Sequence, residues 1–429
     1  MKLWVYIVRR LLLMIPVLIG VVTITFIIIS AVPISERLTA CIPPSRRQPQ
    51  PGTPAYENEL RICGLDVPIY QQYGNYLLNS FTFKWGFIQN SSADGMWQHA
   101  PQVKPCLQLP VSQSEGGCEV VTLIGAWLPY TMELALLSLA IILLMAIPMG
   151  NLSAVNRNRA FDQASRVFSF SGFAVPGYLL GALLILALFF ILTLVNPSGG
   201  CDGSPYNEII GSWHASLNNA DQACFTQVTT VNGQTVSTVM WNAKPPYANA
   251  IYATHPTGFP TVDGIIYALQ NTPPPGMPGG RYYFWDLVAD HVLRLIIPAL
   301  TIAYGTVALL LRYVRNSMLE VMNLDFVRTA RSKGVPERLV VKHHAGRNSL
   351  NVTVTVLGLT FAGFLAGFAV IESLFGLFGV GMLFAYSVFP SPDISTIFAS
   401  TVLFTVIIVV ANVIVDVVYG ILDPRVRLG

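Results

Sequence analysis

The stretch from Asp325 to Asn348 reads DFVRTARSKGVPERLVVKHHAGRN, and it sets the topology of the chain. It is the longest strongly charged segment in an otherwise apolar second half, and hydrophobic runs long enough to cross a bilayer flank it on both sides. Lysine and arginine concentrated between two membrane spans mark a loop that stays in the cytoplasm. The pattern predicts a helix, a break at Gly334-Val335-Pro336, and then a second helix.

The composition as a whole is that of a membrane protein. Hydrophobic residues make up 53% of the 429 positions and charged residues only 11%, whereas a soluble domain carries about a quarter charged residues. The net charge of +3 is too small to indicate a nucleic-acid partner. The run Leu11–Val32 follows basic residues as a signal peptide does, but it is too long for an h-region and no A-x-A site follows it. We therefore expect a retained first span.

Six segments contain the ~20 apolar residues that are needed to cross a bilayer. Placing the lysine- and arginine-rich connections in the cytoplasm predicts an all-α polytopic membrane protein with six transmembrane helices and both termini cytoplasmic. The predicted order is 1–32 (N-terminus and first span), 33–122 (outside), 123–149 (second span), 150–166 (cytoplasmic loop), 167–195 (third span), 196–291 (outside), 292–312 (fourth span), 313–349 (cytoplasmic loop), 350–375 (fifth span), 376–396 (outside) and 397–429 (sixth span and C-terminus).

All cysteines fall in the two long segments that are predicted to lie outside. An even number of cysteines confined to the exported side indicates disulfides in an oxidising compartment. Metal binding is the alternative, but the sequence has no C-x-x-C and no histidine at ligand spacing. Proximity in the sequence favours three pairs: Cys41–Cys63, Cys106–Cys118 and Cys201–Cys224.

Two local patterns predict structure within these outer segments. Leu65, Ile69, Tyr73 and Leu77 have the spacing of a short amphipathic helix lying along the membrane face. Asn232-Gly233, between alternating valine and threonine, is a strong hairpin signal. We expect a disulfide-stapled extracytoplasmic cap, which is either a structural lid or docking platform or a surface that contacts sugars or peptides.

The motifs of several enzyme classes are absent from the sequence. It has no Walker A loop, no H-E-x-x-H, no G-x-S-x-G and no G-x-G-x-x-G, so we expect no catalytic, metal or cofactor site in this chain. Polar groups within spans default to a functional hypothesis, and small residues allow close helix packing. Candidates for a transmembrane path or gate are Glu133, Gly363, Gly367 and Glu372, with ordinary packing or structural hydrogen bonding as the alternative.

Four blocks resemble the membrane permease subunit of bacterial ATP-binding-cassette importers, in the dipeptide, oligopeptide and nickel branch. They are RRLLLMIPVLIGVVTITFII from Arg9, LPYTMELALLSLAI from Leu128, SMLEVMNLDFVRTARSKGVPERLVVKHHAGRNSL from Ser317, and NVIVDVVYGILDPRVRLG from Asn412. The third block resembles the loop through which such permeases couple to their ATPase. The resemblance implies a type I importer-like permease in the bacterial plasma membrane.

The resemblance also implies partners and roles. A second homologous permease subunit, two ATP-binding-cassette ATPase subunits and an extracytoplasmic substrate-binding protein are expected beside membrane lipid, with ATP and Mg on the ATPases. This chain would form half of a path for short peptides. Pro336 is expected at the first position of the helix after the break. The residues implied in ATPase coupling are Asp325, Arg328, Thr329, Ala330, Arg331, Lys333, Gly334, Val335, Pro336, Glu337 and Arg338.

Departures from the family pattern keep alternatives open. Arg328-Thr329-Ala330 stands where the general coupling pattern has Glu-Ala-Ala, Phe378 stands where proline is usual, and the outer segments are longer than the family norm. The same architecture imports nickel chelates or oligosaccharides in some branch members. A carrier or channel that works without ATP, or a membrane-anchored receptor, is the alternative from another class. The basic residues of the loop would then serve only to keep it inside.

Overall fold

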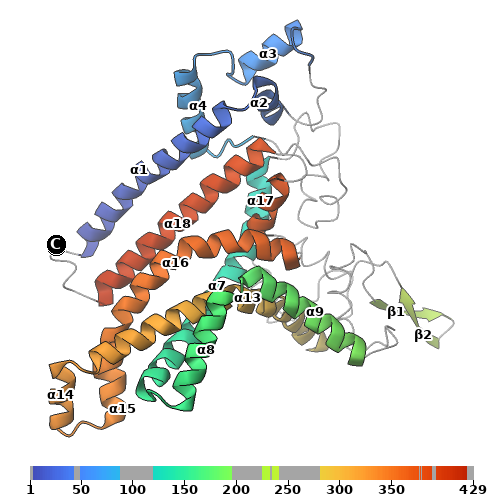
Figure 1. The fold of residues 1–429 in the computed structure, drawn as a ribbon. Coiled ribbons are helices and arrows are strands. Elements are labelled where there is room, and N and C mark those ends of the chain that lie inside the picture. The colour runs from blue at the N-terminus through green and yellow to red at the C-terminus, as the bar shows by residue number, and fades with distance from the viewer. Residues whose placement is uncertain are drawn as a thin grey trace.

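The computed structural model describes residues 3–42, 49–86, 119–195, 225–231, 234–240, 281–375, 377, 379–388 and 393–422. Within these ranges the chain is predominantly helical (Figure 1). The elements in chain order are α1 (Leu3–Ser30), α2 (Ile34–Cys41), α3 (Pro54–Ile62), α4 (Ile69–Phe81), α7 (Val120–Val155), α8 (Ala160–Ala174), α9 (Gly177–Val195), β1 (Phe225–Val231), β2 (Gln234–Met240), α13 (Arg281–Val321), α14 (Asp325–Ser332), α15 (Glu337–Leu339), the π-helix η3 (Val340–Ala345), α16 (Gly346–Phe375), α17 (Val380–Val388) and α18 (Ile394–Leu422).

Four helices of the described part, α1, α7, α13 and α18, are long and apolar enough to cross a membrane. Two bent pairs would raise the total to six if each pair is one span: α8 with α9, at 102°, and the end of α16 with α17, at 90°. The first bend has a local cause. Val175 precedes Pro176 and is extended, with ψ 113°, because a residue before proline avoids the helical region.

The long helix α13 lies at the centre of the helical assembly and contacts α7, α8, α9 and α16 (Figure 1). In the middle of the bundle, α7 contributes Leu134 and Ile142, α13 contributes Leu310, and α16 contributes Phe368 to one buried cluster. This cluster joins segments that are far apart in the sequence, and it positions α13 relative to α7 and α16.

Small residues set how closely α13 approaches its neighbours. A Cβ atom added to Gly172 of α8 would collide with the Ala308 side chain of α13, and one added to Gly150 of α7 would lie 2.6 Å from Val314 Cγ1. Such close backbone approach is typical of helix packing in membranes. We conclude that α8, α13 and α7 form a tightly packed group.

Large apolar side chains cover the outside of the bundle. Leu12, Ile28, Leu144 and Val167 are each at least 60% exposed. In water such a surface would favour aggregation. Lipid tails are as apolar as leucine, so in a membrane there is no hydrophobic driving force to bury it. The exposed face therefore contacts lipid or another membrane subunit.

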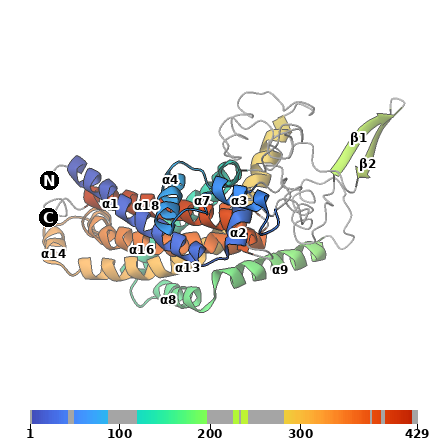
Figure 2. The same cartoon turned by 90° about the horizontal axis from the view of Figure 1, so that it is seen from above.

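The outer elements pack onto α18. α1 and α18 lie side by side in both views (Figures 1 and 2) and are in contact. A buried cluster that includes Val22, Trp127, Leu383 and Phe398 joins α1, α7, α17 and α18.

The amphipathic helix predicted from Leu65 to Leu77 is shorter at its start. α4 follows Pro68, so Leu65 lies before it, in the connection from α3. Its predicted place in the amphipathic helix was therefore wrong, because Pro68 is the N-cap of that helix and separates Leu65 from it.

The hairpin prediction is confirmed. β1 and β2 pair antiparallel with Val231 opposite Gln234, so the connection consists of two residues, 232 and 233, at the position of the Asn-Gly signal.

Candidate functional site

The loop that the sequence predicts to be cytoplasmic forms a compact unit, residues 325–340, which we call the cytoplasmic knob after that prediction. Its first helix, α14, is closed at the C-terminal end by a Schellman motif: Gly334 N donates to Arg331 O at 2.9 Å, and Val335 N donates to Ala330 O at 3.3 Å. Gly334 has φ +75°, a left-handed conformation that glycine adopts without steric cost. The predicted break at Gly334 therefore has a defined geometry.

Pro336 lies one position earlier than predicted. It is the N-cap of α15, with ψ 138°, and its carbonyl accepts hydrogen bonds from Leu339 N at 2.8 Å and Val340 N at 3.1 Å. The expected first helical position is taken by Glu337. The cause is the extended backbone that follows the Schellman turn, which leaves Pro336 outside the helical region.

The helix predicted after the break runs without interruption into the next long helix. α15 passes into the π-helical turn η3, which passes directly into α16 at Gly346. A Cβ atom on Gly346 would lie 2.9 Å from Val341 O, so glycine allows this tight transition. The knob is therefore joined to α16 without an intervening loop.

An apolar base fixes the knob to the bundle. Val327 and Ala330 are the buried residues of α14, and they pack with Met318 of α13, Val340 of η3 and Ala154 of α7. Val327 and Val340 are fully buried. The buried face of α14 is therefore part of one apolar cluster with residues of α7, α13 and η3.

The outer surface of the knob is basic and internally braced. Arg331 binds Glu337 across the turn through two hydrogen bonds, Nε–Oε2 at 3.0 Å and Nη2–Oε1 at 2.7 Å. This pair lowers the pKa of the Glu337 carboxyl and raises the pKa of Arg331. Arg328 lies 3.6 Å from Asp325, and both are exposed. The Arg331–Glu337 pair, which we call the brace, ties α14 to α15. Arg328, Lys333 and Arg338 remain exposed to solvent.

A buried carboxylate behind the knob joins three helices. Asp162 of α8 is completely buried and accepts hydrogen bonds from Ser153 Oγ of α7 at 2.7 Å and from Arg166 Nη2 at 2.7 Å. Arg315 of α13 binds the same carboxylate through Nε at 2.6 Å and Nη2 at 3.0 Å. The backbone N–H of Asn158 adds a further bond at 2.9 Å. Every lone pair of the buried charge is therefore satisfied.

Our sequence interpretation did not single out Asp162. The available signal is that Asp162 is the only acidic residue in 150–166, a segment that also holds Arg157, Arg159 and Arg166. A lone carboxylate among arginines in an apolar chain is a reasonable candidate for a structural ion pair. Its partner Arg315 is 153 positions away, which no local pattern reveals.

Glu372 occupies the bend between α16 and α17 and is buried. Its Oε1 accepts from Thr131 Oγ1 of α7 at 2.8 Å, and its Oε2 accepts from Met382 N at the start of α17 at 2.9 Å. Thr131 in turn accepts from Val380 N at 2.8 Å. The carboxylate therefore satisfies free N–H groups at the N-terminus of α17 and ties α17 to α7.

The other predicted path residues lie on two helices, α7 and α16. Glu133 is half-buried on α7, two residues after the Thr131 that binds Glu372. Gly363 and Gly367 belong to α16, but their side-chain surroundings lie outside the described residues. Four of the predicted disulfide cysteines also lie outside the described residues: Cys106, Cys118, Cys201 and Cys224.

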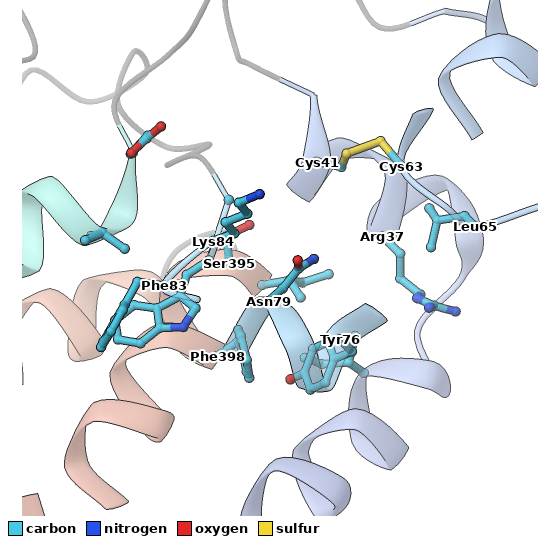
Figure 3. A pocket seen from close by; sticks show the side chains of 16 residues that line it. Arg37, Cys41, Cys63, Leu65, Tyr76, Asn79, Phe83, Lys84, Ser395 and Phe398 are labelled. Carbon is cyan, nitrogen blue, oxygen red and sulfur yellow. A yellow bond between two sulfur atoms is a disulfide. The ribbon is translucent and has the colours of Figure 1, made fainter. Parts of the chain in front are cut away.

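In the first segment that the sequence predicts to lie outside, Cys41 of α2 is joined to Cys63 after α3 by a disulfide with a Cα–Cα distance of 6.0 Å. The disulfide borders a cavity of about 470 Å³ between the outer helices and the start of α18 (Figure 3). Arg37, Lys84 and Glu119 line the cavity together with Phe398. The cavity thus combines charges of both signs with an apolar wall.

Residues 146–428 match the family described as the binding-protein-dependent transport system inner membrane component. The chain belongs to this family, and it is a multi-pass protein of the bacterial plasma membrane. The match includes the cytoplasmic knob, the Asp162 network and the Glu372 bend.

The chain is similar to several peptide permeases along nearly its whole length. It is 29% identical to the oligopeptide transport system permease protein AppB of Bacillus subtilis over 98% of this chain and 99% of the relative. It is 27% identical to the dipeptide transport system permease protein DppB of Escherichia coli K12, with 98% of each covered. A putative peptide permease of Brucella ovis is 38% identical over 33% of this chain and 44% of its own length.

Proposed function

We propose that this chain is one of two permease subunits of an ATP-driven importer and forms half of a path for short peptides. Six spans with both termini in the cytoplasm, and a disulfide-stapled cap outside, complete the proposed topology. Support for peptide as substrate comes from the printed functions of the relatives, which are oligopeptide and dipeptide permeases.

The observation that carries the coupling role is the construction of the cytoplasmic knob. Its apolar base packs on α13 and α7 through Val327, while its exposed face presents Arg328, Lys333 and Arg338. A rigid basic projection suits an acidic groove on an ATPase subunit. Because the knob continues into α16, closure of the ATPases around ATP would tilt the membrane helices and alternate access to the path.

The remaining partners are proposed from two features, the missing ATP-binding motif and the exposed apolar surface. The sequence has no Walker A loop, so ATP and Mg would bind to two separate ATPase subunits. The apolar exposed faces suit a second homologous permease together with lipid. The cap would receive an extracytoplasmic substrate-binding protein. Among the path candidates, Glu372 would hold the α16–α17 bend in place, and Glu133, Gly363 and Gly367 would line or gate the path.

The test is peptide uptake by the complete transporter in proteoliposomes, with Arg328→Glu as the variant. Arg328 is exposed and only loosely paired, so its reversal should leave folding intact. A carboxylate facing an acidic groove costs several kcal/mol, and we expect ATP-driven uptake to fall at least about tenfold. The matched control is Arg61→Glu on the outer side, where Arg61 is exposed and lies 3.8 Å from Asp66.

The same assay separates the alternatives. Uptake of di- and tripeptides, a nickel chelate and an oligosaccharide would be compared in parallel, and peptide is expected to be the transported class. Uptake that continues without ATPase subunits would favour a carrier and contradict the proposal. Equal uptake by the Arg328→Glu and Arg61→Glu transporters would contradict the coupling role of the knob.

A further inference from the structure

A basic groove, which the proposed transport cycle does not use, runs between α8 and α13. It encloses about 450 Å³, within the range of small-molecule sites. Four arginines line it, and none of the described residues that line it is acidic; the arginines are Arg157, Arg166, Arg312 and Arg315. With the buried Asp162 that binds two of them, the local charge is four positive and one negative, or +3.

The four arginines are not equivalent. Arg166 and Arg315 are held by Asp162, and Arg315 is mostly buried, with 12% of its side chain exposed. Arg157 and Arg312 are exposed, and within the described part of the chain neither takes part in an ion pair. The groove thus has two pre-oriented guanidinium groups in its wall and two further cations available to a ligand.

The opposite end of the groove is apolar. Arg166, Phe170 and Phe173 recur at spacings of four and three along α8, so they lie on one face of that helix. Phe170 is 70% and Phe173 is 58% exposed, and both line the groove. The groove therefore combines a cluster of cations with an exposed aromatic surface.

In the proposed topology, on which this inference rests, the groove extends from the cytoplasmic face into the membrane. α8 and α13 run antiparallel, since Asp162 bonds Arg315 and Ser171 bonds Tyr304. Arg157 precedes α8 and Phe173 lies near its C-terminal end, so in that topology Arg157 is at the cytoplasmic end and Phe173 is nearer the membrane interior. The cationic end thus faces the headgroup layer of the inner leaflet and the aromatic end faces the acyl chains.

We propose that this groove binds an anionic phospholipid, with the headgroup phosphate between the arginines and one acyl chain along Phe170 and Phe173. Basic pockets between membrane helices on the cytoplasmic side bind acidic headgroups for this electrostatic reason. Arginine suits the role because its planar guanidinium matches phosphate oxygens. The bound lipid bridges α8 and α13 and adds to the Asp162 ion pair that already joins them.

The test uses the assembled transporter in detergent, titrated with phosphatidylglycerol and, separately, with phosphatidylethanolamine or inorganic phosphate, and binding is followed by native mass spectrometry. We expect saturable phosphatidylglycerol binding. The double variant Arg157→Gln/Arg312→Gln should weaken it roughly 30-fold, about fivefold for each arginine. The variant Arg157→Lys/Arg312→Lys retains the charge and should recover most of the binding.

The matched control is Lys342→Gln/Arg347→Gln, which removes the same charge from exposed positions outside the groove. Equal loss in this control, or equal binding of phosphatidylethanolamine, would overturn the proposal. If inorganic phosphate displaces the lipid, and if Phe170→Ala/Phe173→Ala leaves lipid binding unchanged, the groove is a free-phosphate site instead. If the groove variant lost ATPase subunits but bound lipid normally, the groove would be a protein contact, and the lipid assignment would be wrong.

Discussion

Arg315 and Asp162 form a two-point ion pair across 153 positions of sequence, with Nε–Oδ1 at 2.6 Å and Nη2–Oδ2 at 3.0 Å. The carboxylate has no exposed surface, and the arginine side chain has little. The pair fixes α13, the helix that precedes the cytoplasmic knob, against the first turn of α8. Two regions whose sequences show no mutual pattern therefore form one mechanical unit.

The first prediction concerns this pair. Asp162→Asn leaves Arg315 as a nearly buried charge with only neutral partners, and breaking a buried pair in this way costs about 3 to 5 kcal/mol. We expect a clearly lower Tm for the purified protein in detergent. The double variant Asp162→Asn/Arg315→Met removes both charges and should recover part of the loss. An unchanged Tm for Asp162→Asn would show that the pair adds no stability.

Gly334 provides the second prediction. Gly334→Ala forces a Cβ into the left-handed region, where L-residues are disfavoured by about 1 kcal/mol, although no side chain lies within 4 Å of the site. We expect faster hydrogen exchange across 325–340 and reduced peptide uptake. Gly20→Ala in α1 is the control, since Gly20 has ordinary helical backbone and open space around it. Equal effects of both substitutions would contradict a special role for the Gly334 turn.

The third prediction is a pH dependence. Arg331 lowers the pKa of Glu337, so the stabilisation of the brace is fully present above the usual carboxyl pKa and is lost only as the pH falls through the lowered value. Between pH 5 and 8 the brace should stay charged. Uptake by Glu337→Gln, relative to wild type, should therefore be reduced by the same factor throughout this range. A ratio that approaches one near pH 5 would mean that Glu337 is already protonated there.

The fourth prediction concerns the cap. The Cys41–Cys63 disulfide closes a loop with a sequence separation of 22, for which the chain-entropy estimate is roughly 3 kcal/mol. Cys41→Ser/Cys63→Ser should lower the Tm and loosen the outer cavity. Peptide mapping of non-reduced protein checks this pair, together with the expected Cys106–Cys118 and Cys201–Cys224. Any fragment that links two different pairs would refute the assignment.

The fifth prediction tests the bend at Glu372. A Cβ added to Gly379 collides with the Glu372 carboxylate, so Gly379→Ala must displace the group that holds the start of α17. We expect uptake to fall and the Tm to drop by several degrees, as for a substitution that costs about 1 to 3 kcal/mol. Gly125→Ala in α7, where no atom lies within 4 Å, is the control and should be silent.

The sequence predicts best where the signal is local. The break at Gly334, the hairpin between β1 and β2 and the apolar helices depend on glycine, on Asn-Gly and on hydrophobic length, and each acts within a few residues. The Gly334 break and the hairpin are present where they were expected, and four single helices of the described part are apolar and long enough to span a membrane. The exact position of Pro336 was missed because the geometry of the preceding turn displaces it from the helix by one residue.

Long-range relationships were not predictable from one sequence. The hydrogen bond of Glu372 to Thr131 spans 241 positions, and the Asp162 pair spans 153. Glu372 was recognised as costly within a span, but periodicity contains no information on which helix supplies its partner. Two predicted spans are bent, one at Val175 and one before α17. The first bend lies at Val175, directly before Pro176, and at the second the Glu372 carboxylate binds the start of α17. Neither local effect is visible in hydrophobic length.

The π-helical turn between α15 and α16 has a mechanical consequence. α16 has 30 residues, which at 1.5 Å per residue makes a rod about 45 Å long. One end of the rod begins at the knob, and the other ends at the carboxylate that anchors α17. In the proposed transport cycle, a small rotation at the knob end would therefore become a sideways displacement at the far end. The helix would act as a lever that pivots on its contact with α13.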